Sequence, residues 1–161
     1  MGIFFKNKNK DLSGWNSYLV NVNNEISSIF VNLDLKNKAP YQEYPKLSWY
    51  WIKMENPKEN GLSSNKDFDS LIEHEDRLEA YFSKLPVTFA GRITTQGRRE
   101  FYFYTTQEFN FETTIKKFVG KKAKYLFQTG EKNDKDWNQY LNLLYPSENG
   151  LNQIKEKLKK A

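Results

Sequence analysis

Cysteine is absent from this chain of 161 residues, and histidine occurs once, as His74. The lack of cysteine excludes disulfides, thiolate nucleophiles and zinc or iron sites built on sulfur, and it fits the reducing cytoplasm. Any catalytic triad or metal site that needs histidine would depend on His74 alone. His74 lies between Glu73 and Glu75, off the apolar stripe of its expected helix. We therefore predict that it is a solvated surface residue, and we expect no metal and no cofactor.

Long apolar runs are also missing. The only one near the N-terminus is Ile3–Phe5, whereas a span needs roughly 18 consecutive apolar residues and a signal peptide needs a longer core than this. The eight glycines are dispersed, and they form no phosphate-binding loop or nucleophile elbow. We expect no membrane span and no enzymatic activity.

Aromatic residues are plentiful in a chain that is otherwise polar. They make up 16% of the residues, against 38% for all hydrophobic residues together. A chain of this length accommodates one domain, and its core must rest largely on Phe, Tyr and Trp. We divide the chain into a flexible N-terminus (1–14), a sheet domain (15–130) and a C-terminal helical extension packed on the same domain (131–161).

The clearest local pattern is a β-hairpin around the dipeptide Gln96-Gly97, which favours a tight turn. In the strand after the turn, Phe101 and Phe103 alternate with Tyr102 and Tyr104, and the strand before it alternates in the same way. One face of this hairpin is therefore predicted to be core, and the other to carry tyrosine and arginine.

The remaining periodicity predicts strands at 15–22, 26–35 and 47–54, helices at 65–84 and 111–119, a strand at 123–128, and two C-terminal helices capped by Asp134 or Asp136 and by Ser147. From residue 47 to 129 the order strand, helix, strand, strand, helix, strand is that of a split β-α-β unit. We predict an α+β fold, a ferredoxin-like sandwich. Its antiparallel sheet has about six strands, with helices on one face and a C-terminal helical pair.

Four segments of the sheet domain form a recognisable set: Pro45-Lys46-Leu47, Glu59-Asn60-Gly61-Leu62, the helix bearing Glu75-Asp76, and the stretch from Gly91-Arg92 to Tyr104. Together they resemble a bacterial family of unknown function, family 695, over roughly residues 15–106. The resemblance implies no activity that could be carried over.

A shorter resemblance lies near the C-terminus. Residues 136–141 (DWNQYL) and 144–147 (LYPS) are similar to a segment of the regulator of ribonuclease E activity, type B. That resemblance implies a ferredoxin-like fold and a small protein that acts by docking on a larger enzyme. An inhibitor that fills a basic nucleic-acid channel should be acidic, whereas this chain carries a net charge of +5.

A structural ion pair is predicted between Glu75 and Arg99. Glu75 lies where Leu71 and Leu78 place the core side of its helix, and a buried carboxylate needs a cationic or hydrogen-bonding partner. Arg99 shares its sheet face with Phe101 by alternation. The alternative is that Glu75 lies at the edge of the core and reaches water.

A binding surface is the sharper functional hypothesis. Alternation places Arg92 on one sheet face with Tyr102 and Tyr104, the strand position at which RNA-recognition modules carry stacking aromatics. The lysines of a basic stretch would add positive charge to this surface; they are Lys121, Lys122 and Lys124. The alternative is that Trp137 and Tyr140 from the C-terminal helix cover this face.

The sequence thus predicts a non-enzymatic cytoplasmic protein that binds another macromolecule, most simply a protein. The second hypothesis is a module that binds single-stranded RNA through the tyrosine face. The third is a hydrolase of unspecified substrate, because several acids share one expected helix, among them Asp67, Asp69, Glu73 and Asp76.

Overall fold

The predicted hairpin is present in the computed structural model, which describes residues 12–160. It joins β4 (Val87–Thr95) to β5 (Arg98–Thr105) through Gln96 and Gly97. Both turn residues have positive φ, 53° and 79°, as a two-residue turn that follows the twist of its strands requires. Residues 1–11 of the predicted flexible N-terminus lie outside the described residues.

Six strands form one sheet in the order β1-β2-β4-β5-β3-β6, and every neighbouring pair is antiparallel. The position of β3 between β5 and β6 is what two helical crossovers of a split β-α-β unit produce, and the N-terminal hairpin extends the sheet beyond β4. The predicted α+β fold with a six-stranded antiparallel sheet is confirmed. The strands not yet delimited are β1 (Trp15–Val22), β2 (Glu25–Asn32), β3 (Lys46–Lys53) and β6 (Phe127–Asn133).

The position of the last strand was predicted wrongly. The expected strand at 123–128 is mostly a connection, and β6 instead runs from Phe127 to Asn133. β6 pairs only with β3 and lies at the edge of the sheet. Because an edge strand is half solvated, its sequence FQTGEKN lacks the apolar alternation by which an inner strand is recognised.

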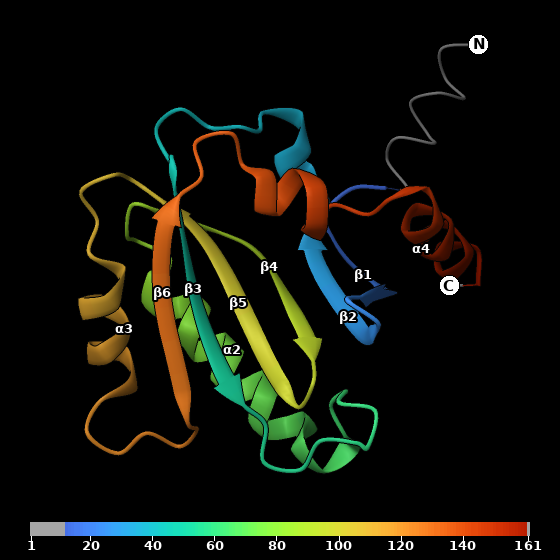
Figure 1. Cartoon of the computed structure of the whole chain (residues 1–161), viewed down its shortest axis with the longest axis horizontal. Coiled ribbons are helices and arrows are strands. Elements are labelled where there is room, and N and C mark those ends of the chain that lie inside the picture. Colours follow the sequence, from blue (N-terminus) through green and yellow to red (C-terminus); the bar gives the residue numbers. More distant parts are fainter. Residues whose placement is uncertain (1–11, 161) are drawn as a thin grey trace.

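Two helices cover one face of the sheet, α2 (Phe68–Phe82) and α3 (Phe111–Val119), as Figure 1 shows. A single 3-10 turn, η2 (Asn65–Asp67), leads into α2. The side chain of Asn110 accepts a hydrogen bond from the Thr113 N–H and caps α3, which ends at Gly120 with φ +74°. The core beneath α2 and α3 is aromatic, with Tyr50, Phe82, Phe101, Phe103 and Phe111 among its buried residues.

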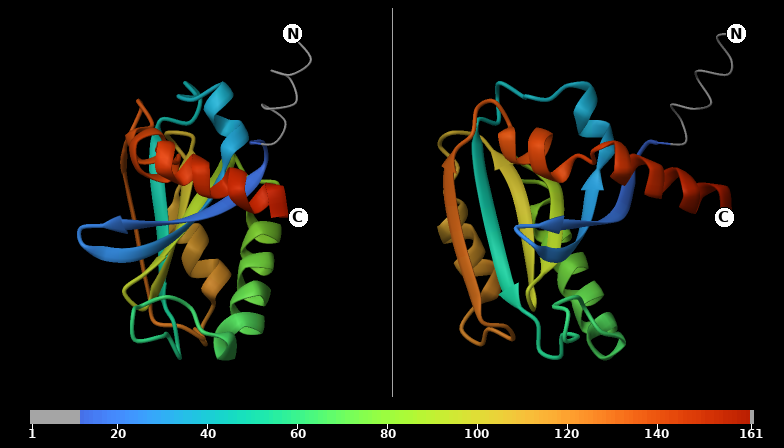
Figure 2. Two further views of the ribbon diagram at one scale, coloured as in Figure 1. Left: turned by 90° about the vertical axis from the view of Figure 1, so that its right-hand side faces the viewer. Right: turned by 45° about the vertical axis from the view of Figure 1, so that its right-hand side comes forward.

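The opposite face is covered by segments that come from both ends of the chain. They are η1 (Leu33–Asn37), the π-helical turn η3 (Tyr140–Leu144) and the start of α4 (Glu148–Lys160). Figure 2 shows the twist of the sheet, which carries the β1–β2 hairpin away from α2, with α4 beside it. The second core cluster lies between these segments and the sheet.

Candidate functional site

We call the sheet face that carries Tyr102 and Tyr104 the tyrosine face. Its half around Tyr104 is covered by other parts of the chain. Trp137 stacks on Tyr104 with ring centroids 4.0 Å apart, and Tyr41 stacks on the other side of Trp137 at 4.7 Å. Tyr104 is fully buried and Tyr102 nearly so. The alternative in which Trp137 and Tyr140 cover this face is therefore confirmed for the half that contains Tyr104, and neither tyrosine ring offers a free surface for stacking a base.

Asp134 holds the covering segment in place. Its carboxylate accepts hydrogen bonds from the Tyr104 hydroxyl at 2.7 Å and from the backbone N–H groups of Asn138 and Gln139 at 2.9 and 3.0 Å. Burial raises the pKa of Tyr104, and the bond to Asp134 raises it further. Of the two predicted caps, Asp134 is thus the one that satisfies the first N–H groups of this turn.

Arg92 lies on the opposite face from the one predicted. A register shift between Phe89 and Gly91 places an extra residue, Ala90, in β4. A bulge of this kind reverses the alternation of every residue beyond it. Arg92 therefore points toward α2, away from Tyr102.

The predicted pair of Glu75 with Arg99 is wrong for the same reason. Arg92 Nη1 lies 2.7 Å from both carboxylate oxygens of Glu75. Arg99 instead donates from Nε to the Thr94 hydroxyl at 3.0 Å and from Nη2 toward Ser63 at 3.5 Å. Burial and, after it, the charge of Arg92 lower the pKa of Arg99, the charge of Glu75 opposes them, and the net result is a pKa of about 10.

We expect Glu75→Ala to lower the free energy of unfolding by about 2 kcal/mol, because it leaves Arg92 half-buried beside Arg99 without a carboxylate. The exposed Asp69 on the same helix provides the control, since Asp69→Ala should cost well under about 0.5 kcal/mol. Urea unfolding of the two variants checks this. Equal midpoints for both would show that the Arg92–Glu75 pair adds no stability.

His74 is buried, with 8% of its surface exposed, and the prediction of a solvated residue is wrong. The inward stripe of α2 consists of Leu71, His74, Leu78 and Phe82, whereas Ile72 is exposed. The spacing of three and four residues through 71, 74 and 78 is the helical period. Because residue 74 is polar, the inward stripe of α2 could not be recognised from its apolar residues alone.

The three predicted lysines do not join the tyrosines. Lys121, Lys122 and Lys124 are exposed on the connection between α3 and β6. Lys122 and Lys124 border a small cavity next to His74, on the α2 side of the sheet. The structure therefore separates the two halves of the RNA-binding hypothesis onto opposite faces.

The acids of α2 do not converge on a reaction centre. Asp67 is buried and accepts two hydrogen bonds from Asn56, from its backbone N–H at 2.8 Å and its side-chain amide at 2.9 Å. Glu75 is engaged by Arg92. Among residues 12–160, no three His, Asp or Glu side chains lie together in position to hold a metal ion.

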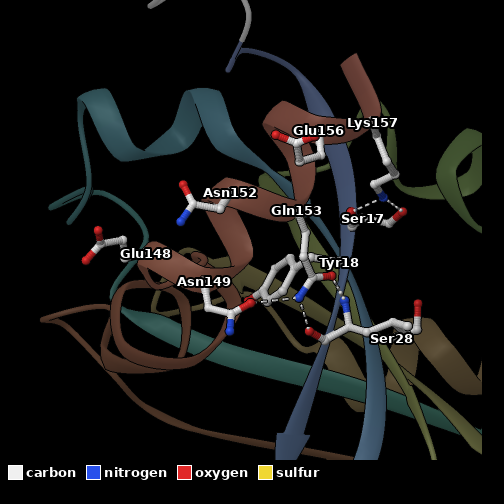
Figure 3. A pocket seen from close by; sticks show the side chains of 10 residues that line it. Ser17, Tyr18, Ser28, Glu148, Asn149, Asn152, Gln153, Glu156 and Lys157 are labelled. Atoms are coloured by element: carbon white, nitrogen blue, oxygen red, sulfur yellow. Dashed lines mark hydrogen bonds between the residues drawn. The ribbon is translucent and has the colours of Figure 1, made fainter. Parts of the chain in front are cut away.

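A hollow of about 850 Å³ lies between β1 and α4. Figure 3 shows that side chains of α4 reach across it and bind β1. The amide of Gln153 accepts from the Leu19 N–H at 2.9 Å and donates to the Leu19 carbonyl at 2.7 Å, while Lys157 donates to Ser17. The two bonds of Gln153 replace those of a neighbouring strand, so α4 protects the open edge of β1.

The other half of the tyrosine face, around Trp51 and Arg98, remains open and contains a groove of about 550 Å³. We call it the Trp51 groove. Leu126 on its rim is the most exposed large hydrophobic residue in the described part of the chain, at 74%. Twelve residues line the groove: Trp51, Ile52, Lys53, Met54, Glu55, Pro57, Gln96, Gly97, Arg98, Leu126, Phe127 and Gln128.

A hydrogen-bonded chain fixes the centre of the Trp51 groove. The guanidinium of Arg98 lies 4.7 Å from the centre of the Trp51 ring. Its Nε donates to Glu100 at 2.5 Å, and the other Glu100 oxygen accepts from the Tyr102 hydroxyl at 2.7 Å. Glu100 is 4% exposed, so both oxygens of a buried carboxylate are satisfied within the protein. Burial and this carboxylate together raise the pKa of Tyr102.

The sequence did not lead us to predict a site at Trp51, Arg98 and Leu126. The alternation that assigned Tyr102 to this face also assigns Arg98 and Glu100 to it, and pairing of β3 with β5 places Trp51 opposite Glu100. Leu126 stands out as an apolar residue in a connection rich in lysine. These signals were present, but choosing between the two ends of the face required the position of the C-terminal segment.

No helix in residues 12–160 combines the length and the hydropathy needed to cross a membrane. Comparison with known families gives a match between residues 13–145 and a family of unknown function, DUF695. No curated protein and no solved structure matches the chain. The matched segment contains the whole sheet, the covering turn η3 and the Trp51 groove, while α4 lies beyond it.

Proposed function

We propose that this chain, which belongs to the family of unknown function DUF695, is a non-enzymatic protein that binds another protein through the Trp51 groove. The observation that carries the proposal is the exposed Leu126 beside a Trp51–Arg98 stack that is fixed from behind. Tryptophan, tyrosine and arginine are the side chains that contribute most often to binding energy at protein interfaces.

The groove is organised before any partner arrives. Glu100 and Tyr102 hold Arg98 over Trp51, so little side-chain entropy remains to be lost when a partner covers the pair. Pro57 and Leu126 add exposed apolar surface to the lining of the groove. A pre-formed apolar centre of this kind with a polar surround is the anatomy of a protein contact.

Charge favours a protein over a nucleic acid. The cations of the groove, Lys53 and Arg98, are accompanied by the acids Glu55 and Glu100. A nucleic-acid groove needs a track of unpaired positive charge and free aromatic faces, and the two tyrosines suggested for that role are buried. The short likeness of residues 136–147 to a docking regulator agrees with a protein partner. We propose the bacterial cytoplasm as its location, which the absence of cysteine supports.

The test is affinity capture by the wild-type chain, by Leu126→Ser and by Leu158→Ser, each with and without nuclease. Leu158 is an exposed leucine of α4, so the same change is made outside the groove. We expect a protein retained by the wild type and by Leu158→Ser, insensitive to nuclease, and weakened at least about tenfold by Leu126→Ser when measured with purified components. Capture that depends on RNA, or that both variants weaken equally, would overturn the proposal.

A further inference from the structure

A second, smaller cavity lies on the other side of the sheet, between α2, α3 and the connection from α3 to β6. Its volume is about 90 Å³, which is room for several water molecules. It therefore has room for a small polyatomic ion. We call it the His74 cavity; it is lined by Tyr50, His74, Arg77, Phe118, Val119, Lys122, Lys124 and Tyr125.

The charged side chains of the His74 cavity all carry positive charge. Among the described residues, Arg77, Lys122 and Lys124 make no ion pair with a carboxylate. The guanidinium of Arg77 lies over the Phe118 ring at 5.3 Å, and the Lys124 ammonium lies 5.6 Å from the centre of the Tyr125 ring. The charged residues that line the cavity are therefore three cations without a carboxylate partner, which favours the binding of an anion.

His74 adds a directed hydrogen-bond donor. Its Nε2 lies 2.9 Å from the hydroxyl of Tyr50, a buried residue whose hydroxyl has no other partner. If Nε2 carried the proton, the Tyr50 hydroxyl hydrogen would be left unpaired in the core, so the hydroxyl donates to Nε2 and the ring proton lies on Nδ1. No acceptor within residues 12–160 pairs with Nδ1, and this atom is not sealed from solvent.

We infer that the His74 cavity binds the phosphate group of a small molecule, either inorganic phosphate or a terminal phosphate monoester. Arg77, Lys122 and Lys124 neutralise its charge, and His74 donates from Nδ1 to one of its oxygens. This site is distinct from the Trp51 groove and does not depend on the function proposed for that groove.

Binding is measured by titrating inorganic phosphate, and in a second arm glycerol phosphate, at neutral pH while the NMR signals of the His74 imidazole are followed. The chain has no other histidine, so the signal is unambiguous. We expect a saturating shift with at least one of the two probes, and the probe that binds more tightly identifies the source of the phosphate. Sodium chloride at the same ionic strength should give no saturation.

The matched variants are Lys122→Gln and Lys121→Gln, because these neighbours carry the same charge but only Lys122 lines the cavity. We expect Lys122→Gln to weaken phosphate binding about tenfold and Lys121→Gln to leave it within about twofold. Equal effects of the two variants, or no saturation with either probe, would overturn the assignment.

Bound phosphate should also raise the pKa of His74. The groups facing the imidazole are Tyr50 from β3, Arg77 from α2, and Lys122, Lys124 and Tyr125 from the connection, while α3 contributes only uncharged residues. An anion among these cations favours the charged imidazolium. A pKa that stays unchanged at saturating phosphate would place the anion elsewhere and overturn the assignment.

Discussion

Replacing Trp137 by alanine is expected to lower the free energy of unfolding by about 3–5 kcal/mol, because it leaves a cavity the size of an indole. Trp137 is fully buried between Tyr41 and Tyr104, and its Nε1 donates to the Tyr44 carbonyl at 2.8 Å. Its loss also removes the contact that fastens the C-terminal segment to the sheet. Urea or thermal unfolding measures the effect.

Trp15→Ala is the matched control, since Trp15 is 36% exposed. It packs against Phe30 and Phe89 at 4.9 and 5.0 Å and is not enclosed by the core. We expect a loss of about 1 kcal/mol for this variant. If Trp15→Ala destabilised the chain as much as Trp137→Ala, the second core would not depend on the C-terminal segment.

The second large effect is a loss of stability in acid that depends on His74. Burial, followed by the charges of Arg77 and Lys124, lowers the pKa of His74 from 6.5 to about 4. Between pH 6.5 and 4 the unfolded chain therefore binds a proton that the folded chain does not. The free energy of unfolding should fall by about 3 kcal/mol across this window and fall no further on account of His74 below it.

His74→Gln isolates this contribution because glutamine does not titrate and retains an acceptor for the Tyr50 hydroxyl. Carboxylates also titrate in this range, so the measured quantity is the difference between the two unfolding profiles. We expect that difference to change steadily between pH 6.5 and 4. Parallel profiles would mean that His74 has an ordinary pKa and is not held neutral in the folded chain.

Alternation and turn chemistry predicted most of the fold because each signal is local. The β4–β5 hairpin follows from Gln96-Gly97, and the end of α3 follows from Gly120, a residue that adopts positive φ at little cost. The covering role of Trp137 and Tyr140 could be weighed from the sequence, because a sheet face rich in aromatics needs a partner in the core.

The predictions for Arg92, Glu75 and His74 were wrong because single residues interrupt a pattern. The bulge at Ala90 moved Arg92 across the sheet and so changed the partner of Glu75 from Arg99 to Arg92. His74 replaced an apolar residue in the inward stripe of α2.

The site could not be predicted from the sequence because it depends on long-range contacts. The open and closed halves of the tyrosine face differ only in where residues 134–145 lie, and nothing local to β3 or β5 specifies that. The residues of the Trp51 groove could not be distinguished from core residues without the three-dimensional structure.

The most direct test of the central claim is NMR mapping of the complex with the purified protein partner. The claim is that the Trp51 groove, and not the β1–α4 hollow, is the contact surface. We predict that the indole N–H signal of Trp51 and the methyl signals of Leu126 change on binding, while the methyl signals of Leu158 on α4 do not. Changes confined to β1 and α4, with Trp51 and Leu126 unaffected, would contradict it.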